Sequence, residues 1–301
     1  MLALGSIARA GIVVNDHWSD GTRTDPAQPV YSELGVDGDS DGNIESLWYS
    51  NGGTNTVTPG HMVTAPPSGS QSYQTYFTPE AFPVNIANIG DTVKVTWVFT
   101  PSGVANDAVN NTGQNFRMGL VDAPSASRLT ADGTPPGAAY TGYAMFLNVD
   151  QTLRRSTPFQ LLKRGTGTTN FLSTAGEWTA LASNGTTGDP GYVSGQQYTF
   201  TWQLTHNASN GLDIDAKMAG AGLGPGGVGQ LEVIFTDPTP AAFTFDMFGV
   251  RPSGAATSAT SIDSTGFMVE ASPVPVAPEP GSLALLSLGG LAALRRRNRH
   301  A

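Results

Sequence analysis

Short runs in which apolar and polar residues alternate constrain the fold of this 301-residue chain most strongly. The pattern is clearest in VKVTWVF from Val93, YTFTWQL from Tyr198 and LDIDAKM from Leu212. A period of two buries one face of a β-strand and leaves the other in water. About ten such runs, bounded by Gly, Pro, Asn and Asp, predict an all-β fold, a two-sheet antiparallel β-sandwich of the jelly-roll type.

The same alternation indicates which side chains form the core. Trp97, Phe200 and Trp202 are expected to be buried between the sheets rather than to bind a ligand. In FTFDMFGV, from Phe243, the pattern predicts Phe243, Phe245 and Met247 on one face. Other aromatic residues lie in or near loops, where they either cap the ends of the sandwich or stack on sugar rings. These residues are Trp18, Trp48, Tyr49, Tyr73, Tyr76, Trp178 and Tyr192.

Charge and cysteine content exclude several classes of function. The formal net charge is -9, and four arginines lie close to the C-terminus, so the rest of the chain is more acidic still. A nucleic-acid partner requires a basic face, which this composition argues against. The chain contains no cysteine, which excludes disulfides, thiolate metal sites and a cysteine nucleophile.

The segment DGDSDGNIESLW, from Asp37 to Trp48, resembles a calcium-binding loop. Alternate carboxylates on a tight turn converge on one point, and calcium takes six to eight oxygen ligands. Trp48 stands at the twelfth position, where a calcium loop has a bidentate glutamate. The alternatives are therefore a structural Ca²⁺ site and a solvated acidic turn. The predicted metal ligands are Asp37, Asp39, Asp41, Asn43 and Glu45.

A second polar cluster lies in DHWSDGTRTD, between Asp16 and Asp25. It either shares one ion with the first loop or forms an ordinary turn at Asp20-Gly21. Its candidate ligands are Asp16, His17, Asp20 and Asp25.

The sequence favours a binding or structural role over catalysis. Glycosidases need two carboxylates flanking the sugar bond, and the nearest approach is Asp213-x-Asp215, without a glutamate. The histidines do not have the spacing of a zinc hydrolase. The alternative is a carbohydrate-active enzyme on the same fold.

The C-terminal segment APEPGSLALLSLGGLAALRRRNRHA combines three signals in order. Leu283 to Leu294 would span about 18 Å as a helix, whereas a bilayer core is about 30 Å thick. The sequence therefore predicts a short transmembrane helix that inserts only transiently in the inner membrane, with its arginines on the cytoplasmic side. The flanking residues are Pro278, Glu279 and Pro280 on one side and Arg295, Arg296 and Arg297 on the other.

This tripartite order resembles the PEP-CTERM sorting signal. The resemblance implies recognition by exosortase and the export machinery, cleavage near Pro278–Pro280, and delivery to the cell surface or the extracellular space. The stretches GDTVKVTWVF, NFRMGLVDA and FTFDMFGVRPSGAATSATSIDSTGFMVE resemble exported PEP-CTERM proteins of planctomycete-type bacteria. Their concanavalin A-like bodies are similar to carbohydrate-binding modules, which implies extracellular polysaccharide as a partner but transfers no established activity.

These observations divide the chain into three parts. Ala8-Arg9-Ala10 has the form of a signal peptidase site, so residues 1–10 are expected to be the remnant of a longer signal peptide. Residues 11–272 are expected to form the β-sandwich domain. Residues 273–301 are expected to form the sorting tail.

Overall fold

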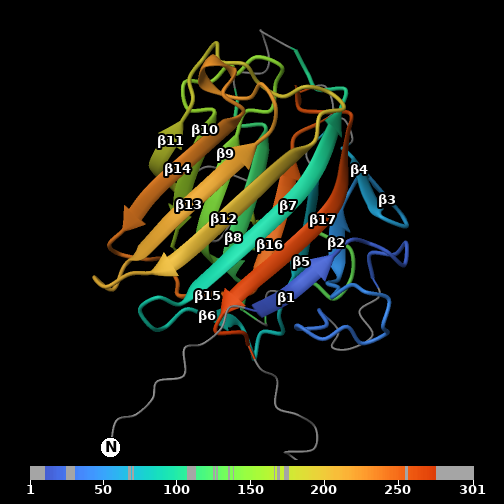
Figure 1. The fold of residues 1–301 in the computed structure, drawn as a ribbon, viewed down its shortest axis with the longest axis vertical. Helices are drawn as coiled ribbons and strands as arrows, with labels where there is room; N and C mark the ends of the chain where they lie inside the picture. Colours follow the sequence, from blue (N-terminus) through green and yellow to red (C-terminus); the bar gives the residue numbers. More distant parts are fainter. Residues whose placement is uncertain are drawn as a thin grey trace, which may run out of the picture.

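The computed structural model describes residues 11–24, 31–66, 69, 71–106, 113–124, 126, 128–134, 136–137, 139–165, 167, 170–172, 176–254 and 257–275. Two large antiparallel sheets lie face to face in this part of the chain (Figure 1). Apart from short 3-10 turns such as Pro225–Gly227, its regular structure is β-strand. The predicted two-sheet antiparallel β-sandwich is confirmed.

The eight-stranded sheet lies in front in Figure 1 and holds the longest strands. β1 adds to it by pairing with β17, outside the main strand order. In that order its strands are β14 (Gln230–Asp237), β13 (Leu212–Ala219), β12 (Tyr198–His206), β7 (Thr92–Ser102), β17 (Ser261–Ser272), β4 (His61–Ala65) and β3 (Thr54–Thr58), with β1 at Gly11–Asp16.

The seven-stranded sheet lies behind it. A separate two-stranded ribbon pairs β15 (Thr244–Phe245) with β6 (Val84–Asn85). In order the strands of the seven-stranded sheet are β11 (Thr179–Asn184), β10 (Phe159–Arg164), β9 (Thr141–Leu147), β8 (Phe116–Asp122), β16 (Met247–Pro252), β5 (Ser72–Tyr76) and β2 (Trp48–Asn51).

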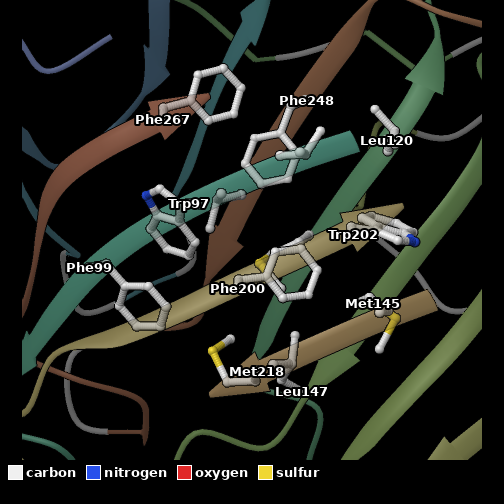
Figure 2. Packing of buried hydrophobic residues seen from close by; sticks show 14 of the residues in the cluster. Trp97, Phe99, Leu120, Met145, Leu147, Phe200, Trp202, Met218, Phe248 and Phe267 are labelled. Carbon is white, nitrogen blue, oxygen red and sulfur yellow. The ribbon is translucent and has the colours of Figure 1, made fainter. Parts of the chain in front are cut away.

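The main core fills the space between the two sheets (Figure 2). Trp97, Phe200 and Trp202 are buried there, as the alternation predicts. The Trp97 ring stacks on Phe99 with centroids 4.1 Å apart, and its indole N–H donates to the Ser264 hydroxyl. Burying one such side chain contributes roughly 1.5–3 kcal/mol, so these aromatic residues supply much of the stability.

A second apolar cluster covers the outer face of the seven-stranded sheet. Phe146 of β9 belongs to it, although its neighbours Met145 and Leu147 belong to the main core. Residues from outside the strands, such as Phe171, lie over this face. This cluster explains why aromatic residues off the main inward positions are nevertheless buried.

The loop aromatics therefore pack inside the fold rather than offer a sugar-stacking platform. Trp18 and Trp48 are 1% and 0% exposed, and Trp178 is 7% exposed. Among the described residues, the exposed large apolar side chains are all aliphatic. Tyr49, Tyr73, Tyr76 and Tyr192 are likewise buried.

The structure corrects the prediction for FTFDMFGV. Phe245 packs in the main core, but Met247 lies in the outer cluster and Phe248 returns to the core. The alternation breaks at Asp246, between β15 and β16, where the backbone N–H donates to Val121 and the carboxylate pairs with Arg128. Asp246 therefore lies outside both strands, and its side chain forms an ion pair instead of following the alternation of a strand.

The predicted C-terminal helix lies outside the described residues, together with Pro278, Glu279, Pro280, Arg295, Arg296 and Arg297. In the described part, no helix combines the length and apolar character required to cross a membrane.

Candidate cation-binding loop

The acidic loop is folded around one buried carboxylate, that of Glu33, which is 3% exposed. One carboxylate oxygen accepts the N–H of Gly38 at 2.7 Å, and the other accepts the N–H of Glu45 at 2.8 Å. The Glu33 N–H donates in turn to the carbonyl of Glu45 at 3.0 Å. Charge-assisted hydrogen bonds of this kind fix the two ends of the loop side by side.

Between these ends the aspartates bind the backbone of their own turn. Asp37 accepts the N–H groups of Ser40 at 2.6 Å and Gly42 at 3.0 Å. Gly42 has a φ of 93°, a conformation that favours glycine. Asp39 accepts the N–H of Asp41 at 3.2 Å. The turn is therefore held by side-chain to backbone bonds, with its carboxylates close together.

Three carboxylates of this loop converge. Oxygens of Glu33, Asp37 and Asp39 all lie within 4.8 Å of one another. Two of the three, Asp37 and Asp39, belong to the predicted ligand set, and Glu33 does not. The position of Glu33, four residues before Asp37, is the sequence feature that could have indicated its part in this cluster.

Two other predicted ligands turn toward β1. Asp41 accepts both the backbone and the side-chain N–H of Asn43, at 2.8 and 3.1 Å. The Asn43 side-chain oxygen accepts the N–H of His17 at 3.2 Å, and Asn43 is 1% exposed. This bond joins the loop to His17, directly after β1. A bridge between Asn15 and Ile44 also joins the loop to β1 itself.

Glu45 is buried among acids. It is 5% exposed, and its Oε2 atom has no hydrogen-bond partner. Burial and, to a smaller extent, the negative charges of Asp20, Asp16, Asp41 and Glu33 raise its pKa to about 9. The groups that shift this pKa include no cation, so an ionised Glu45 is not compensated by the residues that the structure describes.

The second polar cluster lies beside this one. Asp16 is 2% exposed and accepts the backbone N–H of Trp18 at 2.9 Å and the indole N–H of Trp48 at 3.3 Å. Burial raises its pKa to about 7, against the effect of these hydrogen bonds. Asp20 holds the turn to Thr22, as expected for an ordinary turn, and Asp25 lies outside the described residues.

The donor set fits a hard divalent cation. Carboxylate and amide oxygens are the ligands that calcium prefers, and each carboxylate can accept more bonds than the loop uses. The Oε2 atom of Glu45, which has no hydrogen-bond partner among the described residues, is an additional buried oxygen that could bind a metal. A bound cation would offset the mutual repulsion of these acids.

Comparison with solved structures finds carbohydrate-recognition and lectin-like domains at low identity and low TM-score. The Emp47p carbohydrate recognition domain shares 13% identity over 75% of this chain and 89% of that chain, with a TM-score of 0.44. The potassium-bound Emp46p carbohydrate recognition domain shares 12% over 74% and 87%, with a TM-score of 0.43. Arcelin-5, a lectin-like defense protein from Phaseolus vulgaris, shares 11% over 74% and 92%, with a TM-score of 0.40. Values this low carry no inference about a ligand.

The C-terminal segment is more informative. Residues 276–298 match the PEP-CTERM protein-sorting motif, which confirms the predicted sorting signal. No curated protein matches the chain.

Proposed function

We propose that this chain is an exported protein, sorted to the cell surface, whose β-sandwich has a binding or structural role in the cell envelope or extracellular matrix. The sorting motif at residues 276–298 carries this proposal. It begins a few residues after β17, which ends at Ser272, so the tail follows the sandwich almost directly. Exosortase is the processing partner that such a motif implies.

Carbohydrate is the ligand class that we propose for the sandwich. The resemblance of its sequence to exported proteins whose concanavalin A-like bodies are similar to carbohydrate-binding modules supports this choice. Because the described aromatic residues are buried or half-buried, sugars would be held mainly by polar side chains. We do not propose a carbohydrate-active enzyme, because Asp213-x-Asp215 lacks the glutamates of a glycosidase motif.

We further propose a structural Ca²⁺ ion in the acidic loop. Glu33, Asp37 and Asp39 are the ligands whose oxygens already converge. Asp41, Asn43 and Glu45 would complete the oxygen set or surround it with negative charge. The ion would strengthen the attachment of residues 33–45 to β1, where Asn43 and Ile44 already bind the backbone of His17 and Asn15.

Mass spectrometry of the mature protein from its native cell tests the sorting proposal. We expect a C-terminus near Pro278–Pro280, either free or carrying an attached group. A mature protein that keeps every residue through Ala301 would overturn processing by exosortase.

A glycan array tests the ligand class. The full chain would be applied with 1 mM-scale Ca²⁺, about the concentration that extracellular calcium modules bind, and again with a chelator. We expect binding to extracellular polysaccharides that weakens without calcium. Absence of binding to every glycan in both conditions would contradict carbohydrate as the ligand.

A further inference from the structure

A polar row crosses the outer face of the seven-stranded sheet. Arg251 of β16 lies directly opposite Arg117 of β8, Arg117 lies opposite Phe146 of β9, and Phe146 lies opposite Gln160 of β10. Side chains alternate along each strand, so these four project away from the main core. Their neighbours Val250, Met118, Met145 and Leu161 pack within it.

Two arginines lie directly opposite each other in this row. Like charges directly opposite each other on a sheet are destabilising, because their β-carbons are only about 4.5–5.5 Å apart. Burial and, to a smaller extent, the charges of Arg251 and Arg155 lower the pKa of Arg117 to about 10. Arginine stays protonated at neutral pH, so Arg117 keeps its positive charge opposite Arg251.

Arg117 is held in place by its surroundings. Its guanidinium lies 4.6 Å from the centre of the Phe146 ring, and Nη1 donates to the carbonyl of Leu172 at 2.8 Å. These contacts orient the group and cover part of it, and the side chain is half-buried. A rigid, partly desolvated guanidinium is a strong donor to a planar anion.

Arg251 is the least satisfied cation of this face. It is half-buried, and it makes no hydrogen bond or ion pair within the part of the chain that the structure describes. Burial lowers its pKa. Seven other basic residues lie within 4.0 Å of a carboxylate, namely Arg23, Lys94, Arg128, Arg154, Lys163, Arg164 and Lys217.

A buried amide beside the row is also unsatisfied. Gln74 of β5 lies opposite Gly249, which is two residues from Arg251 on the same face. Gln74 is 0% exposed, and neither its Nε2 nor its Oε1 atom has a hydrogen-bond partner. Buried amides are normally bonded, so Gln74 has an unused donor and acceptor on this face of the sheet.

The ring of Phe171 bounds the surface next to Arg117 and Arg251. A β-carbon at Gly119 or Gly249 would come within 2.4 or 2.6 Å of the Phe171 ring. Only glycine therefore allows that ring to lie on the sheet one row away from Arg117 and Arg251. The ring provides an apolar wall beside the charged groups.

We propose that Arg117, Arg251 and Gln74 form a binding site for a carboxylate, and that its ligand is a uronic-acid-containing polysaccharide. This deepens the proposed carbohydrate function and rests on it. A carboxylate between two guanidiniums would accept paired hydrogen bonds and remove their repulsion. Arg155 would add long-range attraction, and Gln74 would bind a neighbouring hydroxyl.

Isothermal titration of the full chain with oligogalacturonides tests the site, with their methyl esters as the uncharged counterpart. We expect the acids to bind, the esters to bind far more weakly, and NaCl to weaken binding of the acids. Arg251→Gln should weaken binding about tenfold, as expected for the loss of one charged hydrogen-bonding group. It should also raise the Tm of the ligand-free protein, because it removes the repulsion.

Lys217→Gln is the matched control. It makes the same charge change on β13 of the other sheet, where Lys217 pairs with Glu232 at 3.7 Å. We expect its affinity for the acids to equal that of the wild type.

Several outcomes would overturn the site. Wild-type affinity in Arg251→Gln, or an equal loss in Lys217→Gln, would place binding elsewhere or reduce it to net charge. A lower Tm in Arg251→Gln would show that the arginine stabilises the fold without a ligand. Binding of acids and esters alike would overturn the carboxylate site but leave the carbohydrate function standing, whereas failure of the whole glycan array would remove both.

Discussion

Asp246 and Glu45 are both buried carboxylates, but only Asp246 is compensated by the chain itself. Arg128 Nη2 donates to it at 2.6 Å, and the Ala123 N–H donates at 2.8 Å. Burial raises the pKa of Asp246, while the Arg128 guanidinium opposes that shift. Arg128 is further enclosed by the rings of Tyr31 and Tyr76, at 5.0 and 4.9 Å. This region is a complete structural ion pair.

Glu45 shows the opposite arrangement. The charged groups that shift its pKa are acids, and its Oε2 atom has no hydrogen-bond partner among the described residues. A buried charge is tolerated when it is paired or binds a metal. The comparison therefore teaches that the Asp246 region is completed by the fold, whereas the Glu45 region is where the proposed cation would compensate the buried acids.

The largest effect is expected from breaking the complete pair. Arg128→Ala would leave Asp246 buried without its guanidinium, which costs about 3–5 kcal/mol. Urea unfolding followed by circular dichroism measures this loss. Lys94→Ala breaks the more exposed pair with Glu270 and should cost less than about 1 kcal/mol. Equal losses in the two variants would show that burial does not distinguish the pairs.

Calcium should stabilise the incomplete region next. At a free concentration of 100 times Kd, a ligand that binds only the folded state adds about 2.7 kcal/mol, seen as a rise in Tm. Asp39→Asn, which changes an exposed member of the converging carboxylates, should remove most of this rise. Asp213→Asn on β13 should keep it. A rise that survives Asp39→Asn would place the ion elsewhere.

A pH series without divalent cations sharpens the comparison further. Glu45 has a folded-state pKa near 9, above its ordinary value of 4.5, so the folded state binds the extra proton between these limits. Stability from this group is present at low pH and declines by up to about 1.4 kcal/mol per pH unit as pH rises toward 9. Glu45→Gln should flatten that slope in urea unfolding from pH 6 to 8. An unchanged slope would assign the titration to another acid, such as Asp16.

The smallest effect is expected where solvent compensates the charge. Asp213 is exposed on β13, and hydrogen bonds from Thr236 and Asn207 lower its pKa. Asp213→Asn should change the free energy of unfolding by less than about 0.5 kcal/mol. A larger loss in the same urea assay would mean that exposed acids also stabilise this fold specifically.

Local sequence patterns predicted much of the fold. The period-two runs at Val93, Tyr198 and Leu212 predicted β7, β12 and β13 and their buried faces, because alternation is a property of each strand alone. The sorting motif was equally local. Phe245 and Met247 were assigned to one face because the pattern contains no sign of the ion pair that interrupts it at Asp246.

Non-local pairing accounts for what the sequence did not predict. Tyr49 and Trp178 were predicted in loops or at the ends of the sandwich, but a second cluster on the outer face of a sheet also buries them. Glu33 joins the acidic loop because its two oxygens bind backbone N–H groups at both ends of the loop. Arg117 and Arg251 are 134 positions apart, and only the strand order brings them together.

The pairing of β1 with β17 has a consequence for how the molecule is displayed. Gly11 lies opposite Ala271, and a β-carbon at Gly11 would come within 2.5 Å of Val274, so the first and last described segments meet at one pole. If the protein were attached to the cell surface through its C-terminal end, this pole of the sandwich would face the surface. Removal of residues from either terminus would then leave the opposite pole of the sandwich facing the solvent.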